Sequence, residues 1–255
     1  MENKFSFTNS VGALVGGLWE DNQSSETILF IHGVGQPSSN HPVMHKICDF
    51  YKEKYNYLKF DFMGFGLSQG NFADFTIANS VLDIEHIVNN IIPPGQKIAA
   101  FARSLGGGSM AAYIAKNPQK ISKIFFHAPA LNTAQVLRQR AAKRLEKEAG
   151  WENWRETFPE DLYQKTWQNQ DATCGIPKAL YQENDQKNYC PNLATLDQSQ
   201  YLIVQGDNDT DVPLGTLSAL PQEQILVVKG GDHRLLEPDM LAQYQDPMIK
   251  FFEQI

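Results

Sequence analysis

The stretch around Ser104 has the residue types and spacing of a reactive serine. Residues 98–101 form a short apolar run typical of a buried strand, and a helical pattern follows over residues 109–116. Between them, Ala102 and Gly106 are small residues two positions either side of Ser104. This is the layout of a nucleophile elbow, although the usual pattern has glycine in place of Ala102. A glycine-rich structural turn would use the same residues, so the segment alone leaves both interpretations open.

A serine hydroxyl reacts at neutral pH when a base removes its proton and an acid orients that base. Two histidines follow Ser104 in the chain, His127 and His233. His233 lies in a glycine-containing loop after the last expected strand, where an imidazole can reach a neighbouring strand end, and an exposed loop histidine is the alternative. His127 ends an expected strand. We interpret it as a buried, hydrogen-bonded histidine and keep it as a candidate substrate contact.

The acid can come from one of two strand ends. The expected strand that ends at His127 offers no carboxylate, because the next 18 residues contain no Asp or Glu. The following strand, residues 201–204, leads into a loop with Asp207, Asp209 and Asp211. Aspartate also favours turns, because its carboxylate accepts hydrogen bonds from nearby main chain. These residues alone leave the choice among the three open.

Strands and helices alternate along most of the chain. The apolar patterns predict strands over residues 5–8, 13–19, 27–31, 57–60, 98–101, 121–127, 201–204 and 224–228, and helices over residues 41–54, 75–92, 109–116, 214–219 and 238–253. This order predicts an α/β fold, a mostly parallel eight-stranded sheet with helices on both faces. Ligands in such folds bind beyond the carboxyl ends of the strands, so the loops that carry the candidate residues converge at one edge.

Residues 131–197 interrupt this alternation. They contain no run typical of a buried strand, and they combine a charged, helix-prone stretch with several aromatic residues. We therefore expect a core of residues 1–130 and 198–255 with a helical cap, or lid, inserted at residues 131–197. Trp151 and Trp154 are candidate substrate contacts in this cap, although they would also suit its own small core.

The composition narrows the classes of partner. The chain has 255 residues, 42% of them hydrophobic, which suffices for a sizeable core. A net charge of −7 argues against a nucleic-acid partner. The three cysteines are widely spaced, and no apolar run approaches the ~20 residues of a membrane helix. The apolar residues 11–19 fit a strand better than a signal peptide, so we expect a cytoplasmic protein without stable membrane insertion. The oligomeric state is left open.

The motifs together resemble those of the α/β-hydrolase superfamily, in which serine, acid and histidine follow one another in this order. Residues 206–213 are similar to its G-x-x-D-x-x-V-P segment, and this resemblance places the triad acid on Asp209. Residues 32–35 are similar to its H-G-x-G loop. The resemblance implies an oxyanion hole formed by the backbone N–H groups of Val34 and Leu105, with His32 packed beneath the loop. Residues 61–68 match D-x-x-G-x-G-x-S, which we expect to shape the pocket wall.

Within the superfamily, residues 60–132 look most like cinnamoyl (feruloyl) esterases and lysophospholipase-like carboxylesterases, and residues 231–235 resemble acyl-protein thioesterases. The resemblance implies a serine hydrolase that cleaves small to medium acyl or aryl esters through an acyl-enzyme, using no metal or organic cofactor. A thioesterase with the same triad is an alternative. A non-catalytic binding protein that keeps the hydrolase fold is an alternative from another class.

Arg103 directly precedes the candidate nucleophile. A cation at this position could meet an acidic group of the substrate, which makes Arg103 a candidate substrate contact. An ion pair with a neighbouring loop is the alternative interpretation.

Overall fold

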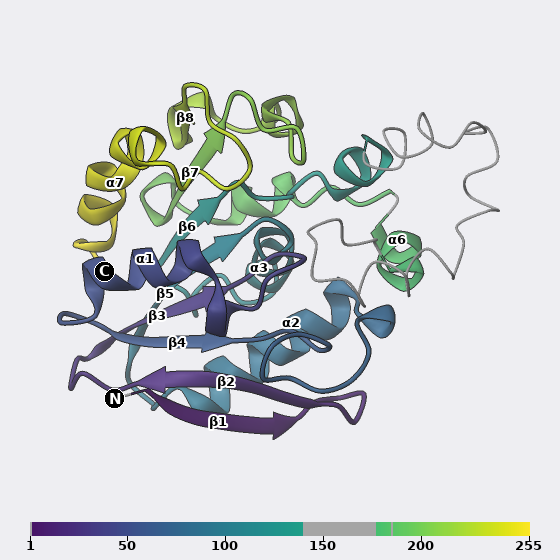
Figure 1. Cartoon of the computed structure of the whole chain (residues 1–255), viewed down its shortest axis with the longest axis vertical. Coiled ribbons are helices and arrows are strands. Elements are labelled where there is room, and N and C mark those ends of the chain that lie inside the picture. The colour runs from purple at the N-terminus through teal and green to yellow at the C-terminus, as the bar shows by residue number, and fades with distance from the viewer. Residues whose placement is uncertain (1, 140–176, 185) are drawn as a thin grey trace.

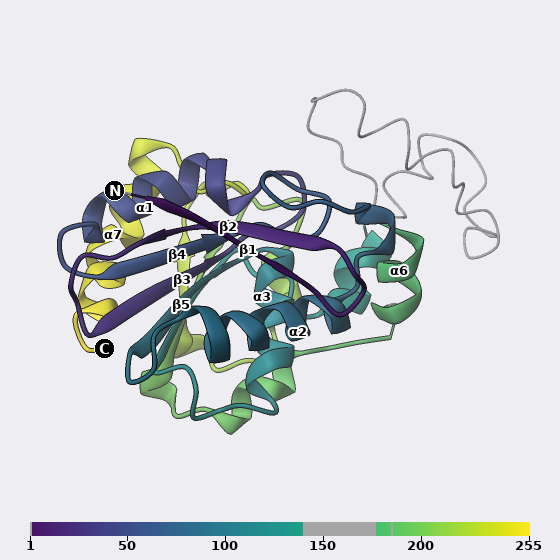
Figure 2. The same ribbon diagram turned by 90° about the horizontal axis from the view of Figure 1, so that it is seen from below.

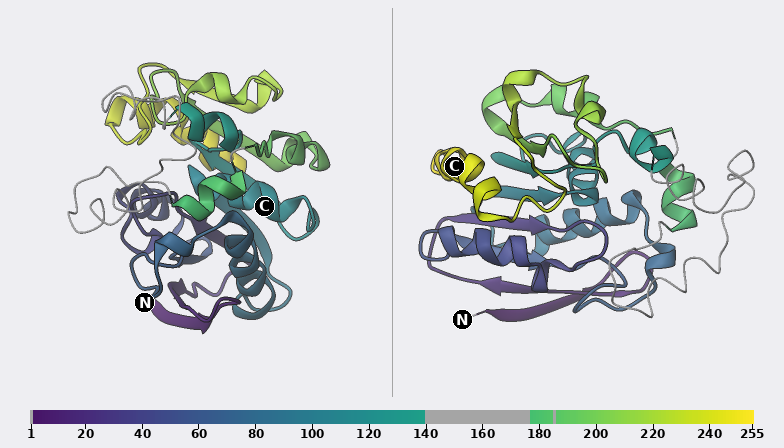
Figure 3. Two further views of the ribbon diagram at one scale, coloured as in Figure 1. Left: turned by 90° about the vertical axis from the view of Figure 1, so that its right-hand side faces the viewer. Right: turned by 45° about the horizontal axis from the view of Figure 1, so that its top comes forward.

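A single eight-stranded sheet forms the centre of the protein. The computed structural model describes residues 2–139, 177–184 and 186–255 (Figure 1). The strands are β1 (Asn3–Thr8), β2 (Leu14–Glu20), β3 (Glu26–Ile31), β4 (Asn56–Phe60), β5 (Lys97–Arg103), β6 (Lys123–His127), β7 (Tyr201–Gly206) and β8 (Ile225–Val228). Their order across the sheet is β1-β2-β4-β3-β5-β6-β7-β8. The β1–β2 hairpin and β8 thus lie at opposite edges, as Figure 3 shows.

The sheet is parallel from β4 to β8 and antiparallel only where β2 joins β1 and β4. The central strands are buried on both faces, which explains why they read as continuous apolar runs rather than alternating patterns. In β3, Leu29 and Ile31 pack into the core on one face, whereas Ile28 and Phe30 pack into the core on the other. The predicted fold class is therefore confirmed.

Within the described part of the chain, four helices cover the two faces (Figure 2). Side chains of α1 (Pro42–Tyr51) and α7 (Pro238–Phe252) belong to the core on one face, and those of α2 (Ile77–His86) and α3 (Leu105–Ile114) to the core on the other. A further helix is α6 (Lys178–Asn184), and α2 continues into a π-helical turn at Ile87–Ile91. Short 3-10 turns occupy Ser38–Asn40, Phe72–Asp74, Cys190–Thr195, Gln198–Gln200, Leu214–Leu217 and Gln222–Gln224.

The helix after Ser104 begins earlier than the sequence pattern predicts. The pattern starts at residue 109, because three successive glycines disfavour a helix. In the structure α3 starts at Leu105 and includes those glycines. Each has a packing reason: a Cβ at Gly106 would collide with the carbonyl of His32, one at Gly107 would lie 2.6 Å from the Pro129 side chain, and one at Gly108 would lie 3.0 Å from the carbonyl oxygen of Ala130. Close approach of the neighbouring loops thus outweighs the low helix propensity.

The described residues between β6 and β7 contain helices and turns and no strand. Residues 133–139 are helical and are followed, beyond the undescribed part, by α6. The Glu183 carboxylate of α6 accepts hydrogen bonds from the backbone N–H groups of Ile77 and Ala78, at 2.6 and 2.7 Å. Those are the first two residues of α2, where a carboxylate satisfies unpaired N–H groups. α6 is therefore tied to the layer that covers the sheet, and the division into core and cap stays a prediction.

None of the helices in the described ranges combines the length and apolarity required to span a membrane.

Candidate active site

Ser104 stands at the turn between β5 and α3 with an unusual main-chain conformation. Its φ is 51° and its ψ is −122°, a region that L-residues with a side chain rarely adopt. Hydrogen bonds to the end of β6 and to the residues after it hold this conformation: Ser104 N–H donates to the His127 carbonyl at 3.0 Å, and Ala130 N–H donates to the Ser104 carbonyl at 2.9 Å. Strain of this kind persists only where the surroundings fix it, and it is common at functional sites.

Small residues surround the elbow because other chain segments pass close to it. A Cβ at Gly33 would lie 2.5 Å from the Cβ of Ser104. Ala102, where the usual pattern has glycine, is fully buried and pairs in register with Ile31 of β3. The methyl group of Ala102 is therefore accommodated within the core between β5 and its neighbours, and the elbow keeps its tight geometry.

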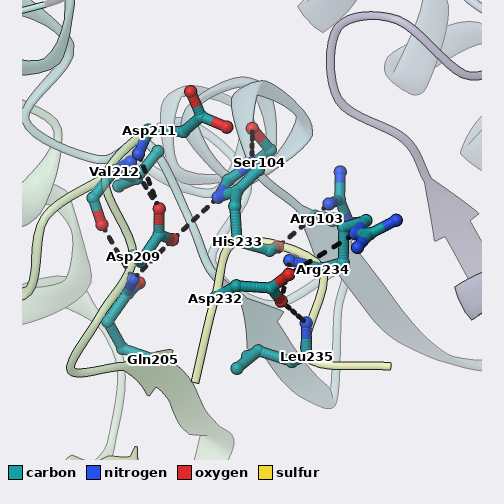
Figure 4. Close-up of polar contacts among 10 residues, drawn as sticks. All are labelled: Arg103, Ser104, Gln205, Asp209, Asp211, Val212, Asp232, His233, Arg234 and Leu235. Carbon is teal, nitrogen blue, oxygen red and sulfur yellow. Dashed lines mark hydrogen bonds and ion pairs between the residues drawn. The ribbon is translucent and has the colours of Figure 1, made fainter. Parts of the chain in front are cut away.

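Three side chains from separate loops meet at the carboxyl edge of the sheet (Figure 4). The Ser104 Oγ lies 3.0 Å from Nε2 of His233, and Nδ1 of His233 lies 2.8 Å from Oδ2 of Asp209. With the carboxylate ionised, Nδ1 carries the imidazole proton, so the lone pair of Nε2 faces the serine hydroxyl. The arrangement can remove a proton from Ser104 and stabilise the imidazolium that results.

The loop after β7 gives its aspartates different surroundings. Asp209 is 4% exposed, and its Oδ1 accepts hydrogen bonds from the N–H groups of Asp211 and Val212 at 2.8 and 2.9 Å. Its Oδ2 accepts from Gln205 Nε2 at 2.8 Å in addition to His233. Asp207 instead accepts from Gly230 N–H at 2.7 Å. Of these carboxylates, Asp209 is the one placed against the imidazole.

The hydrogen bonds around Asp209 and His233 set their protonation. Burial raises the pKa of Asp209, but the hydrogen bonds from His233, Val212 and Gln205 outweigh this effect and hold the pKa below its ordinary value. Burial is the largest influence on the pKa of His233 and lowers it, the hydrogen bond to Asp209 raises it, and the charge of Arg103 lowers it again. The net pKa of His233 lies below its ordinary value, so the imidazole is neutral at pH 7.

Two backbone N–H groups lie in segments that flank the Ser104 side chain. Leu105 is the first residue of α3, so its N–H has no acceptor within the helix. Val34 belongs to the loop after β3, and its N–H has no backbone acceptor among the described residues. Gly33 brings this loop against Ser104. Within the part of the chain that the structure describes, both N–H groups therefore lack a main-chain acceptor, and their role as an oxyanion hole stays a prediction; in hydrolases, one such donor typically contributes ~2.7–4 kcal/mol of transition-state stabilisation.

Hydrogen bonds of His32 and Asp61 hold the loop that carries Val34 in place. His32 is fully buried, and its Nε2 accepts a hydrogen bond from Phe62 N–H at 2.8 Å. Burial lowers the pKa of His32 to about 4, which keeps the ring neutral as this bond requires. The Asp61 carboxylate accepts from Ser39 N–H and Leu67 N–H, both at 2.9 Å. Residues 61–68 therefore brace the neighbouring loop.

The remaining candidate substrate contacts are Arg103, His127, Trp151 and Trp154. Arg103 is buried and directs its guanidinium to the carbonyl of His233 at 3.0 Å. His127 is fully buried, with its Nε2 3.3 Å from the Tyr244 hydroxyl, and its main-chain carbonyl accepts the hydrogen bond from Ser104 N–H. Trp151 and Trp154 lie outside the described residues. In the described part of the chain, no group of three or more His, Cys, Asp or Glu residues could hold a metal ion.

Sequence reasoning missed two supporting residues. Gln205 is fully buried in β7, and Tyr244 is fully buried in α7. An amide within the apolar run of a central strand is a signal that could have singled out Gln205, because a buried amide needs hydrogen-bond partners. Tyr244 lies at a core position of an amphipathic helix, where a tyrosine carries no such signal.

Comparison with known proteins agrees with this geometry. Residues 22–210, well over half of the chain, match the family described as serine aminopeptidase, S33. The chain belongs to this family of α/β-hydrolases. No curated protein matches the sequence significantly.

Solved structures of α/β-hydrolases share the fold over the whole length of the chain. Est1E from Butyrivibrio proteoclasticus, solved with ferulic acid bound, is 18% identical, covers 99% of both chains and has a TM-score of 0.72. An esterase from Pyrococcus furiosus is 16% identical over 100% of this chain and 91% of its own, with a TM-score of 0.69. Alpha/beta hydrolase domain-containing protein 10 from mouse is 17% identical over 99% of both chains, with a TM-score of 0.66.

The contact between Gly33 and Ser104 predicts a selective defect. Gly33→Ala places a methyl group against the Ser104 side chain and displaces the loop that carries Val34. We expect the rate of labelling of Ser104 by a fluorophosphonate to fall about a hundredfold, since misplacement by ~1 Å has effects of this size. Gly215→Ala is the matched control, because its new methyl group meets no atom within 4 Å. Equal labelling of Gly33→Ala and wild type would contradict the prediction.

Proposed function

We propose that this α/β-hydrolase is a serine esterase that cleaves small to medium acyl or aryl carboxylic esters through an acyl-enzyme. The observation that carries the proposal is the unbroken hydrogen-bonded line from Ser104 Oγ through the His233 imidazole to the Asp209 carboxylate. Each element of this line is needed to make an alcohol nucleophilic at neutral pH.

In the proposed mechanism, Ser104 Oγ attacks the acyl carbon while Nε2 of His233 takes its proton. The carbonyl oxygen becomes an oxyanion held by the N–H groups of Val34 and Leu105. Collapse of this intermediate expels the alcohol, which receives the proton from His233, and leaves the acyl group on Ser104. A water molecule then attacks the acyl-enzyme with His233 again as base, and Ser104 is released with its proton restored. Asp209 stays ionised throughout and stabilises the imidazolium.

Two considerations favour esters as the substrate class. The sequence resemblance around the elbow is to feruloyl and lysophospholipase-like esterases, and two of the solved structures that share the fold are described as an esterase and as a protein that holds ferulic acid. The family description names an aminopeptidase, and an amide substrate would use the same residues. An ester is the easier bond to cleave, because resonance stabilises an amide more than an ester and an alkoxide leaves more readily than an amide anion.

Substrate panels test the proposal directly. We expect the purified protein to hydrolyse p-nitrophenyl esters of two to eight carbons or aryl esters faster than aminoacyl p-nitroanilides and acyl thioesters, as measured by kcat/KM. Ser104→Ala should lower kcat/KM at least about a thousandfold and abolish fluorophosphonate labelling. Faster turnover of aminoacyl anilides would identify a peptidase, and faster turnover of thioesters a thioesterase. Absence of labelling in wild type would indicate a binding protein that keeps the fold.

The surroundings of the aspartates predict which one acts as the acid. Asp209→Asn removes the charge that stabilises the imidazolium and turns an amide toward Nδ1, so kcat should fall about 10³–10⁴-fold. Asp207→Asn is the matched control. Its amide oxygen can still accept the Gly230 N–H, and kcat should stay within about tenfold of wild type. The reverse order of effects would place the acid on Asp207.

The lowered pKa of His233 predicts activity at mildly acidic pH. The base must be neutral, so kcat/KM falls as the pH drops through the pKa of His233 in the free enzyme. Because that pKa lies below the ordinary 6.5, the acid limb of the profile should have its midpoint below pH 6.5. The measurement is kcat/KM for a neutral ester between pH 4.5 and 8. A midpoint above pH 7 would contradict the assignment of His233 as the base in this environment.

A further inference from the structure

The guanidinium of Arg103 lies beneath the loop that carries His233. Arg103 is the last residue of β5 and is 5% exposed, so almost none of its side chain meets solvent. Its Nη2 donates a hydrogen bond to the main-chain carbonyl of His233 at 3.0 Å (Figure 4). The residue before the nucleophile therefore holds the main chain of the base.

The same loop is held at a second point by α7. The Tyr244 hydroxyl donates to the carbonyl of Leu235 at 3.0 Å. Within the loop, the Asp232 carboxylate accepts from the N–H groups of Arg234 and Leu235, both at 2.9 Å, and Leu235 has a φ of 53°. Two buried side chains from different elements thus donate to carbonyls two residues apart, one of His233 itself and one of Leu235. The position of this main chain sets where Nε2 lies relative to Ser104.

The position of Arg103 is costly, which points to a role beyond packing. A buried guanidinium loses the favourable free energy of its hydration, and an ion pair with a carboxylate usually compensates for this loss. In the described residues, Nε of Arg103 has no hydrogen-bond partner, and the nearby charges of Asp209 and Asp211 act on Arg103 through space rather than through an ion-pair contact. Burial lowers the pKa of Arg103 to about 10, so it keeps its charge at neutral pH.

We propose that Arg103 is a positioning residue: its guanidinium fixes the main chain of His233 so that the imidazole stays in line between Ser104 and Asp209. This inference rests on the proposed function of the Ser104 site. It assigns Arg103 to the base rather than to an acidic group of the substrate, because the guanidinium is covered and its hydrogen bond is made to the protein.

The positive charge of Arg103 also lowers the pKa values of the histidines around it. After burial, it is the largest influence that lowers the pKa of His41, to about 2, and the pKa of His127, well below its ordinary value. It also lowers the pKa of His233. The charged and titratable groups around His233 are Asp209, Asp211, Arg103, His41, His127, Asp232, Arg234 and Tyr244. Removal of the Arg103 charge should therefore raise the pKa of His233.

Two substitutions separate the hydrogen bond from the charge. Arg103→Lys keeps the charge but loses the planar guanidinium that reaches the His233 carbonyl, and Arg103→Gln loses both. The matched control is Arg234→Gln, an arginine next to His233 whose side chain is 69% exposed and pairs with Asp232 at 3.4 Å. The first readout is the rate of labelling by an uncharged fluorophosphonate. We expect a fall of about a hundredfold in Arg103→Gln, a smaller fall in Arg103→Lys and wild-type rates in Arg234→Gln.

Paired esters distinguish positioning from substrate binding. For p-nitrophenyl acetate and mono-p-nitrophenyl succinate, we expect Arg103→Gln to lower kcat by a similar factor, with little change in either KM. The acid limb of kcat/KM should move to higher pH in Arg103→Gln and stay in place in Arg103→Lys. A loss confined to the anionic succinate ester would show that Arg103 binds substrate and would overturn the proposal.

The outcomes also separate this inference from the function on which it rests. If wild type is neither labelled nor active on esters, the proposed function fails. If wild type is labelled and both Arg103 variants are labelled at the same rate, only the positioning role fails. Circular dichroism will show whether Arg103→Gln folds, and if it does not, Arg103→Lys decides the question. A labelling rate and a kcat equal to those of wild type in Arg103→Lys would overturn the proposal. A fall in both quantities with an unchanged KM would support it.

Discussion

The main chain at Ser104 is held in a conformation that serine does not adopt by preference, and the site depends on that constraint. A positive φ turns the side chain up from the end of β5 and starts α3 at the next residue. The hydrogen bonds are made with His127, the last residue of the neighbouring strand β6, and with Ala130 just after it, so the strain is maintained by the sheet itself. A Cβ at Gly33 would collide with the Ser104 side chain and one at Gly106 with the His32 carbonyl, so the turn is closely packed on both sides. The loops that carry the imidazole and the N–H donors must therefore place these groups relative to a fixed Ser104 side chain.

Electrostatics at this edge of the sheet are governed by a few buried groups. One cation, Arg103, lies among histidines whose pKa values burial has lowered, so those rings are neutral neighbours rather than competing charges. The carboxylate of Asp209 is ionised because four hydrogen bonds converge on it. In surroundings of low dielectric constant such interactions are strong and salt screens them little. The protonation of Asp209 and His233 is thus set by the fold more than by the solvent.

Much of this architecture follows from local sequence patterns. Continuous apolar runs predicted the central strands, because strands buried on both faces carry no polar alternation, and the turn at residues 9–10 predicted the hairpin of β1 and β2 at the edge. The strand ends placed Ser104, Asp209 and His233 at one edge, where the structure finds them in contact. Their catalytic roles stay predictions. The start of α3 was wrong by four residues, because tertiary packing of glycines overrides helix propensity there.

Other features could not be derived from patterns. The carbonyl that Arg103 holds is a main-chain atom 130 residues away, and nothing in the sequence marks such a partner. The same holds for Tyr244, whose hydroxyl meets Leu235 only because α7 packs against the sheet. The cap boundaries at residues 131–197 and the surroundings of Trp151 and Trp154 stay predictions, since they fall wholly or partly outside the described residues.

The long sequence separations within the site have a consequence for biosynthesis. His233 reaches Ser104 across 129 positions of the chain, and its loop follows β8, the outermost strand at one edge of the sheet. Contacts of this kind form only after the intervening loops have closed, which makes them late events in folding. A nascent chain that has emerged as far as β6 already carries Ser104 but lacks His233, its proposed base. Under the proposed function, the hydroxyl of such a chain stays inert until the last strands have joined the sheet, and an unfinished chain on the ribosome has no esterase activity.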